Sequence, residues 1–481
     1  MRATLRIVGA RTAPWPLLQR SAVQTPRAPL RSPSVAAASL YTRAMSEHDM
    51  NSIIISATRA QELLGLHRMH GQFYSGVNLA TCWSRLGRVS AEDRTWLRTD
   101  DGAQLFALRA QTGDDVEKLG GRAVSNIAHA LARLDLCGPQ WMGLWKKLEG
   151  AALQCRSEFM PQELANMAWA FARAGHASDS LMDAIAEESA ERLDDFKPQE
   201  LANTAWAFAT AGHAAPALFH AIGKESAGRV REFKPQELKD MAWAFATAGH
   251  AAPALFEAIG NEAAGRVREF HPQALANTAW AFSTTGYRAP ALFDAFGKEA
   301  AGRVHEFSAQ DLANTALAFA KAGHAAPALF DMIAKESAGR LGEFRSQGLT
   351  NMAWAFAKAG NPTPALFDAI GKESAGRVHE FSAQGLANSA WAFAVLDHLP
   401  AEPSFFDQHF AHRCDALADE FSVEALCQLH QWRLWYAGEP DGLPGAELLG
   451  SCKAAFDTTR PKSTPSTTES KYTPWRPAER R

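Results

Sequence analysis

The sequence repeats itself every 37 residues, and this period restricts the possible folds more than any other feature. Seven copies open on a phenylalanine at that constant spacing: Phe159, Phe196, Phe233, Phe270, Phe307, Phe344 and Phe381. An eighth, degraded copy opens at Phe421, and residues 76–87 and 123–135 match the same frame upstream. A unit this short cannot bury its apolar faces alone, so the copies must stack on one another along the chain.

Each copy is expected to contain two helices, helix A and helix B. In the second full copy, Pro198 fits the first position of helix A, because that position needs no backbone N–H. Gly212 supplies the left-handed residue that ends helix A. Pro216 begins helix B, which we expect to run to about Val230. Later copies start with Ser-Ala, and "SAQD" at residues 308–311 predicts a capping box.

Helical spacing assigns one face of each helix to a core. The apolar face of helix A consists of residues at i, i+3, i+4 and i+7, namely Leu201, Thr204, Ala205 and Phe208. Helix B supplies the opposing residues Leu218, Phe219, Ile222 and Val230. The predicted fold is therefore all-α, an α-solenoid of tandem 37-residue helix-turn-helix repeats.

The repeat and the composition together divide the chain into five segments. We expect a disordered transit peptide, divergent helical repeats, the regular solenoid, a helical capping segment and a disordered basic tail rich in Ser, Thr and Pro. The boundaries are, in that order, 1–46, 50–158, 159–436, 437–456 and 457–481.

The first 46 residues have the composition of an organellar presequence. They contain seven arginines, no acid and many Ser and Ala residues, and no early continuous apolar run of a secretory signal. This predicts the mitochondrion, in the matrix. A plastid presequence and a disordered cytosolic tail remain alternatives.

The rest of the chain is acidic and carries few markers of other functions. Beyond residue 46 there are 42 Lys and Arg side chains against 52 Asp and Glu, which counts against a generic phosphate-coated partner. The six cysteines form no CxxC pair, and no apolar run approaches the roughly 18 residues of a membrane span. We expect no metal, no cofactor, no membrane and, in the absence of a nucleophile–base or carboxylate pair, no catalytic residue.

Helix A also carries a polar and aromatic face opposite the core, which we call the amide–indole stripe. It consists of residues at i, i+4, i+7 and i+11 in every copy. Its members are Gln162, Asn166, Trp169 and Arg173; Gln199, Asn203, Trp206 and Thr210; Gln236, Asp240, Trp243 and Thr247; Gln273, Asn277, Trp280 and Thr284; Gln310, Asn314, Leu317 and Lys321; Gln347, Asn351, Trp354 and Lys358; and Gln384, Asn388, Trp391 and Val395.

Two interpretations of this stripe are open. Indole faces could stack on the splayed bases of single-stranded RNA while the amides bond base edges. Alternatively, the stripe is a structural ladder in which each Asn satisfies a neighbouring backbone group and each Trp packs between adjacent helices A. Phosphate contacts would fall first to Arg173, Lys197, Lys234, Lys321, Arg345 and Lys358. Residues identical in every copy cannot encode different bases, so target choice is expected where copies differ, as at Lys197 and Glu200.

Two further recurring positions are assigned structural roles. The histidines after helix A, His176, His213, His250 and His324, lie one repeat apart, too far for shared metal coordination, and are expected to pack in turns. The arginines near the end of helix B are expected to complement the helix dipole and nearby acids: Arg229, Arg266, Arg303, Arg340 and Arg377.

The unit "PQELANTAWAFATAGH…PALFDAIGKESAGRV" resembles the octotricopeptide-repeat family of organellar RNA-binding proteins. It is also similar to the leucine-rich region of FAST-kinase-domain proteins and to the helical repeat domain of a kinetoplastid RNA-editing substrate-binding complex subunit. The resemblance covers about residues 52–456. It implies an organellar protein that binds transcripts or rRNA, with other RNA-processing proteins as partners, and acts in processing, stability, rRNA maturation or translation. The alternative is a non-catalytic protein–protein scaffold, which the acidic body favours.

The end of the chain differs from this family pattern. Residues 421–456 are similar to the segment that often precedes a RAP domain, which has an endonuclease-like fold, but the sequence then turns into "DTTRPKSTPSTTESKYTPWRPAERR". A nuclease role is therefore not expected.

Overall fold

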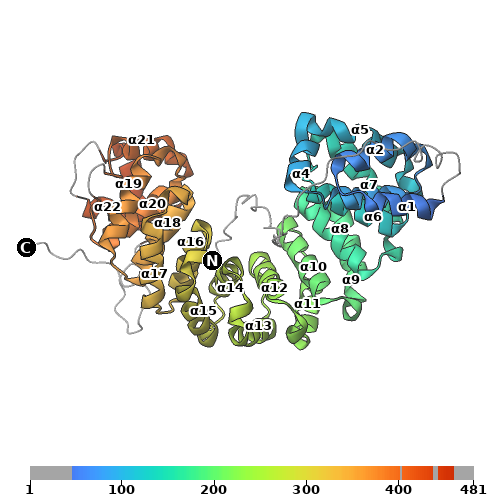
Figure 1. The fold of residues 1–481 in the computed structure, drawn as a ribbon. Coiled ribbons are helices and arrows are strands. Elements are labelled where there is room, and N and C mark those ends of the chain that lie inside the picture. The colour runs from blue at the N-terminus through green and yellow to red at the C-terminus, as the bar shows by residue number, and fades with distance from the viewer. Residues whose placement is uncertain (1–45, 401–403, 437–441, 460–481) are drawn as a thin grey trace, which may run out of the picture.

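The computed structural model describes residues 46–400, 404–436 and 442–459. The secondary structure within these ranges consists of helices, without a strand. Consecutive helices follow one another along an open arc (Figure 1). The predicted all-α solenoid is confirmed. The predicted transit peptide lies almost wholly outside the described residues, and so does the tail after Thr459. Within the described ranges, no helix combines the length and apolar character that crossing a bilayer requires.

The regular part of the array alternates the two predicted helices. Helices A are α8 (Pro161–Ala174), α10 (Pro198–Ala211), α12 (Pro235–Ala248), α14 (Pro272–Thr285), α16 (Ala309–Ala322), α18 (Ser346–Ala359) and α20 (Ala383–Val395). Helices B are α9 (Asp179–Ala190), α11 (Pro216–Gly228), α13 (Pro253–Gly265), α15 (Pro290–Gly302), α17 (Pro327–Ala338) and α19 (Pro364–Ala375).

Less regular helices cover both ends of the array. The N-terminal ones are α1 (Glu47–Ser56), α2 (Ala60–His70), α3 (Gly76–Leu86), α4 (Ala91–Arg98), α5 (Phe106–Asp115), α6 (Gly121–Arg133) and α7 (Met142–Gln154). The C-terminal ones are α21 (Gln408–Ala416), α22 (Val423–Trp435) and α23 (Ala446–Thr459). Helices α3 and α6 pack in line with α8, and α22 packs on α20, so the layer of helices A continues through both ends.

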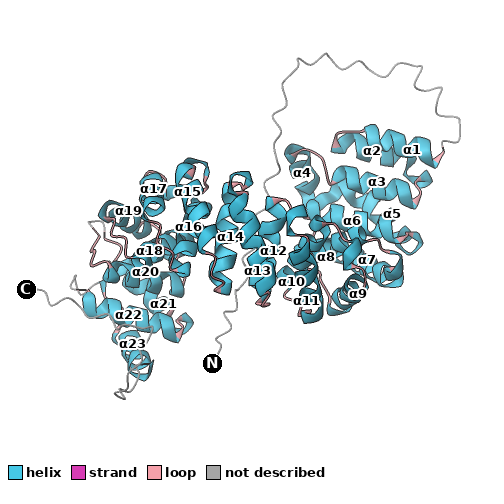
Figure 2. Cartoon of the chain, turned by 90° about the horizontal axis from the view of Figure 1, so that it is seen from below, coloured by secondary structure: helices cyan, strands magenta, loops and turns pink. Residues whose placement is uncertain are grey.

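The two kinds of helix form the two sides of the arc. Each helix A packs against the next helix A, and each helix B against the next helix B. Helices A lie on the inner side of the arc, and helices B form its outer side, which Figure 2 shows from below. The face of helix A that points away from helix B therefore borders the hollow of the arc.

The predicted helix ends are confirmed at both ends of helix A. Pro198 occupies the first turn of α10, and Gly212 after it has φ +66°, in the left-handed region. At α16, Ser308 and Asp311 form the predicted capping box. Helix α11 ends at Gly228, two residues before the predicted end at about Val230. A 3-10 turn, η8 (Val230–Glu232), then redirects the chain so that the next phenylalanine is buried.

The predicted core stripe is buried, and aromatic edges join one unit to the next. Leu201, Thr204, Ala205 and Phe208 have no exposed surface. Phe219 of helix B meets Phe245 of the following helix A edge to face, with ring centroids 5.1 Å apart. The same contact recurs along the array in the pairs Phe256–Phe282, Phe293–Phe319, Phe330–Phe356 and Phe367–Phe393. A small residue of helix B lies under each ring: a Cβ at Gly223 would lie 3.2 Å from the Phe245 ring, and α17 has Ala334 at the same position.

The arginine after α13, α15 and α19 bonds the start of its own unit. Nη1 of Arg266 donates a hydrogen bond of 2.9 Å to the carbonyl of Phe233, the residue that opens the same unit. Its guanidinium also bonds Glu262 and Glu269, and the hydrogen bond to Glu269 is the main cause that raises the pKa of Arg266. Arg303 and Arg377 bond the carbonyls of Phe270 and Phe344 in the same way. The predicted pairing with nearby acids is confirmed, and the carbonyl contact adds to it.

Replacing Arg266 by alanine should loosen the unit that it closes. The change leaves the Phe233 carbonyl without its charged donor, and hydrogen bonds to charged groups contribute about 1.5–3 kcal/mol. We expect hydrogen exchange of the α12 and α13 amides to show local opening made easier by about that amount. Arg268→Ala is the control, since Arg268 is exposed and forms no side-chain hydrogen bond or ion pair with any described residue. Equal exchange in the two variants would contradict this role.

Candidate functional site

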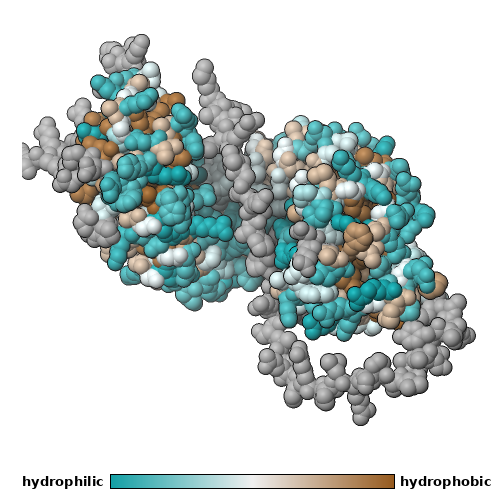
Figure 3. Space-filling view, turned by 90° about the horizontal axis from the view of Figure 1, so that it is seen from above, coloured by the Kyte–Doolittle hydropathy of each residue, from teal (hydrophilic) through white to brown (hydrophobic). Residues whose placement is uncertain are grey.

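The amide–indole stripe lies on the face of helices A that borders the hollow of the arc. Its glutamines are exposed, apart from the half-buried Gln236, and its asparagines are half-buried. Five of its six tryptophans are half-buried, while Trp206 is only 6% exposed. Figure 3, which looks down into the arc, shows a mainly hydrophilic surface on both arms. The predicted position of the stripe therefore agrees with the structure.

The tryptophans form a ladder along the array. The ring centroids of Trp169 and Trp206 are 6.3 Å apart, as are those of Trp206 and Trp243, with interplanar angles near 30°. Trp354 and Trp391 are 6.2 Å apart in the same arrangement. The structural interpretation is correct for these rings, because each packs between adjacent helices A.

The asparagines do not make the hydrogen bonds that the structural interpretation predicts. That interpretation required each amide to bond a neighbouring backbone group, as Asn78 of α3 does with the carbonyl of Glu47. Five half-buried asparagines make no side-chain hydrogen bond with any described residue: Asn166, Asn203, Asn277, Asn314 and Asn351. The indole N–H groups of the stripe likewise have no partner among the described residues, and none is sealed from solvent. Partly buried polar groups without protein partners are available to a ligand.

Helix α12 interrupts the stripe. Lys239 and Asp240 stand where α10 has Ala202 and Asn203, and both are buried and paired with each other. Burial raises the pKa of Asp240 against the opposing effects of Lys239 and of the hydrogen bond from Gln236. The single acid of the stripe is thus neutralised by its neighbour, and the inner wall is not uniformly acidic.

The predicted phosphate contacts do not form one group. Arg173 is paired with Asp135 at 2.8 Å, with its guanidinium 5.8 Å from the Trp169 ring centre. Three others are exposed residues that precede the first turns of α10, α12 and α18, namely Lys197, Lys234 and Arg345. Lys321 and Lys358 are exposed at the opposite helix ends, and desolvation lowers the pKa of Lys321.

The third residue of helix A, which varies between copies, caps the start of the helix in α10 and α12. The carboxylate of Glu200 accepts the backbone N–H of Lys197 at 2.9 Å, and the side chain is only 8% exposed. Glu237 does the same for Lys234. In α16 and α20 a serine caps the start instead, and α14 and α18 have no side-chain cap, so the variable positions that a ligand can reach are the exposed first residue and the exposed last residue of the stripe.

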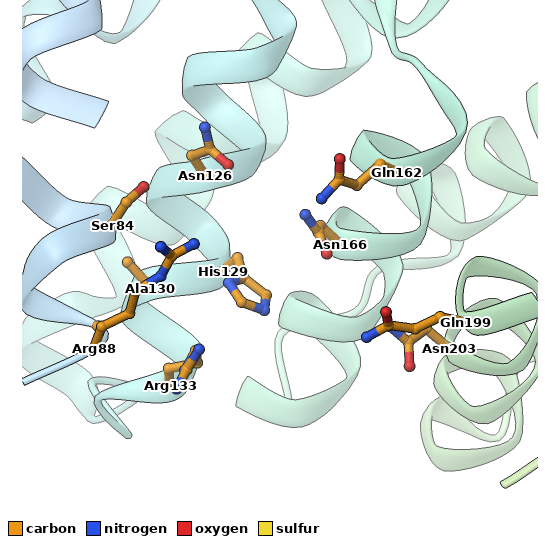
Figure 4. Close-up of a pocket in the computed structure, with 11 residues that line it drawn as sticks. Ser84, Arg88, Asn126, His129, Ala130, Arg133, Gln162, Asn166, Gln199 and Asn203 are labelled. Carbon is orange, nitrogen blue, oxygen red and sulfur yellow. The ribbon is translucent and has the colours of Figure 1, made fainter. Parts of the chain in front are cut away.

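A hollow of about 250 Å³ lies at the N-terminal end of the stripe, between α3 and α10 (Figure 4). The stripe residues that line it are Gln162, Asn166, Gln199 and Asn203. Its other side chains come from α6 and from the end of α3, namely Ser84, Arg88, Asn126, His129 and Arg133. The sequence-based site omitted these five residues. A signal for two of them was present, because His129 and Arg133 follow Asn126 at the offsets that separate Trp169 and Arg173 from Asn166.

The hollow is electropositive. Arg88, Arg94 of α4 and Arg133 form no ion pair with any described residue. Burial lowers the pKa of Arg133, and the charges of Arg88 and Arg94 lower it further. Burial also lowers the pKa of His129 to about 4, with the charges of Arg133 and Arg88 as further causes. The neutral His129 ring packs on Trp169 with centroids 5.0 Å apart, so the hollow adjoins the tryptophan ladder.

The histidines that follow helix A pack in turns, as predicted. His213 bonds Asp183 at 2.8 Å and contacts the Phe208 ring, and His324 bonds Asp294 at 3.0 Å. His250 lies against the rings of Phe219 and Phe245. Within the described ranges, no group of three or more His, Cys, Asp or Glu side chains is placed to hold a metal ion.

Comparison with known proteins gives one family match. A family model described as RNA-editing substrate-binding complex 6 protein matches residues 115–301 and 191–422, which together span more than half of the chain. The match includes α6 and all the helices that carry the stripe. No curated protein matches the chain. Of the resemblances seen in the sequence, the one to the RNA-editing substrate-binding complex is supported, and those to octotricopeptide-repeat and FAST-kinase-like proteins stay predictions.

Replacing Arg133 by glutamine should raise the pKa of His129 above its value of about 4, because a like charge is removed. The folded-state pKa of His129 lies below its ordinary 6.5, so its neutral form stabilises the fold above pH 6.5. That contribution is lost as the pH falls from 6.5 towards 4. An NMR titration of the labelled imidazole measures the pKa, and chemical denaturation between pH 7 and pH 4 measures the loss of stability. Arg231→Gln, a charge change in η8 outside the hollow, should leave the titration of His129 unchanged, and an unshifted His129 in the Arg133 variant would refute the electrostatic account.

Proposed function

Because the chain belongs to the RNA-editing substrate-binding complex 6 protein family, we propose that it is a non-catalytic RNA-binding component of an organellar RNA-processing complex. Its ligand is single-stranded RNA, held along the inner face of the arc. The organelle is the mitochondrion, on the composition of residues 1–46, with the plastid as the alternative. The RNA is a transcript or rRNA, bound for processing, stabilisation, maturation or translation.

One observation carries this proposal. A row of half-buried amides and indole N–H groups faces the hollow of the arc and has no hydrogen-bond partner among the described residues. The row recurs on helices A along the array, with a break at α12, so it suits an extended strand better than a compact ligand. Unpaired bases present donors and acceptors on their edges and therefore match such a row.

The ladder determines how bases can meet the tryptophans. A base inserted between two indoles needs a ring separation of about 7 Å, twice the roughly 3.4 Å spacing of stacked bases. The ring centroids of Trp206 and Trp243 are 6.3 Å apart, with their planes tilted. We therefore propose that bases contact indole edges and N–H groups beside the half-buried asparagines, and do not intercalate between the rings.

This mode of binding would tolerate many sequences. The asparagine and tryptophan positions are nearly identical from unit to unit, so each unit offers the same groups to each base. Variation that a ligand can reach lies at the exposed first residues, such as Lys197 and Arg345, and at the last stripe position, as in Lys321 and Lys358. Selection of a particular transcript then depends on these positions or on partner proteins in the complex.

Three asparagines provide the direct test of the row. The triple variant Asn203→Ala, Asn277→Ala and Asn314→Ala should bind single-stranded RNA more weakly, by about two- to tenfold per residue, because each change removes one hydrogen bond. The fold should persist, since these amides bond no described residue. Fluorescence anisotropy with labelled RNA of mixed sequence measures the affinity. Asn261→Ala, an exposed amide on α13 of the outer side, should bind like the native protein.

One helix A of the array already has a different residue at the tryptophan position of the ladder. Leu317 occupies the tryptophan position of α16 and is buried there, so leucine is compatible with this packing. Trp354→Leu should therefore keep the fold and weaken RNA binding through the loss of an indole. Leu317→Trp should strengthen binding by completing the row. If the native protein binds no single-stranded RNA and its inner face instead captures a protein, the scaffold alternative is correct.

A further inference from the structure

We propose that the hollow between α3 and α10 is a phosphate-binding site that holds one backbone phosphate of the bound RNA. The strand would thereby be anchored at the N-terminal end of the inner face. The identity of the strand rests on the proposed function, whereas the affinity of the hollow for phosphate rests on its own residues.

The hollow has two complementary walls. Figure 4 shows Arg88, Arg133 and His129 on one side and the amides of Gln162, Asn166 and Gln199 on the other. Guanidinium and amide N–H groups are the donors that proteins use for phosphate oxygens, and arginine matches phosphate geometry with paired N–H groups. No carboxylate is among the residues that line this space. The volume of about 250 Å³ admits a phosphate with part of its nucleotide, but lies below that of most pockets for larger molecules.

The charge of the hollow is unusual in this acidic protein. The recurring arginines of the array are paired with acids, as Arg266 is with Glu262 and Glu269. Asp135, the nearest acid along the chain to Arg133, is occupied by Arg98 and Arg173. Arg88 and Arg133 are thus left with a mutual repulsion that an anion would relieve, since Arg88 is one of the charges that lower the pKa of Arg133.

The position of the hollow connects it to the rest of the inner face. His129 forms part of the arginine wall and packs on Trp169, which stacks in turn on Trp206. Asn166 and Asn203 belong both to the hollow and to the amide–indole stripe. A phosphate held here would therefore place the adjoining nucleotides directly along the stripe.

The experiment compares two double variants of the full chain. Arg88→Gln with Arg133→Gln removes the arginine wall, and Arg231→Gln with Arg268→Gln makes the same charge change in the exposed 3-10 turns η8 and η9 (Val267–Glu269). The RNA affinity of each is measured across a series of salt concentrations. We expect the first variant to lose about tenfold or more in affinity at low salt. Its slope of log affinity against log salt should fall by about 0.7, the value for one phosphate on a single strand. The control should keep both values.

Two further arms identify the source of the phosphate and separate this inference from the proposed function. The first compares the affinities for RNA with and without a 5′-phosphate. If the Arg88/Arg133 variant loses affinity only for RNA that carries the 5′-phosphate, the assignment to a backbone phosphate is overturned. Inorganic phosphate is titrated against the labelled His129 resonance of the native protein and of the Arg88/Arg133 variant, whose fold is checked by the same spectra. A shift in the native protein alone supports the site.

The outcomes are distinct for the two proposals. If both double variants bind RNA like the native protein, the phosphate site is refuted while the proposed function stands. If the native protein binds no RNA but its His129 resonance shifts with phosphate, the function is refuted and the site stands. An unchanged His129 resonance with phosphate, together with unchanged RNA affinity, overturns the site without reference to the function.

Discussion

The edge-to-face contact between Phe219 of one unit and Phe245 of the next is the interaction on which the rest of this structure depends. It recurs at five of the six junctions of the regular array with nearly the same centroid distance, from 5.0 to 5.1 Å, whereas α9 has Met182 at the position of Phe219. Aromatic edges fix the relative position of two helices more narrowly than aliphatic contacts do. The glycine or alanine of helix B beneath each ring allows the close approach. One local contact, repeated, therefore gives successive units from α11 to α20 the same junction.

A uniform junction has a functional consequence, because it brings the same face of every helix A to the inner side. Asparagines without a hydrogen-bond partner among the described residues recur along this side, and the tryptophans contact one another in two groups, Trp169–Trp206–Trp243 and Trp354–Trp391. The surface is uniform where the units are identical and changes character at its N-terminal end. There the tryptophan position is His129, an arginine follows it, and the acids that neutralise other arginines are engaged elsewhere.

The fold could be predicted because its determinants are local. A proline marks the start of helix A, a glycine marks its end, and the i, i+3, i+4, i+7 spacing marks its buried face. Each of these signals can be recognised within one unit, and all three agree with the structure. The roles of Asn203 and Trp206 could not be separated in this way, since both lie on one face and only contacts with adjacent helices distinguish them. The basic hollow was missed for a different reason. Arg88 lies in the turn after α3, where the repeat is degraded and the alignment with other copies does not predict the position of a side chain. The offsets from Asn126 do predict the positions of His129 and Arg133.

The central claim is that RNA lies along the inner face of helices A. Ultraviolet crosslinking in purified organelles, followed by mass spectrometry of the crosslinked peptides, tests it most directly. The account predicts nucleotide adducts on peptides from residues 159–395, above all on those that carry Trp206 and Trp243. Recovery of the protein without any RNA adduct in this range would contradict the account and leave a protein-binding scaffold in its place.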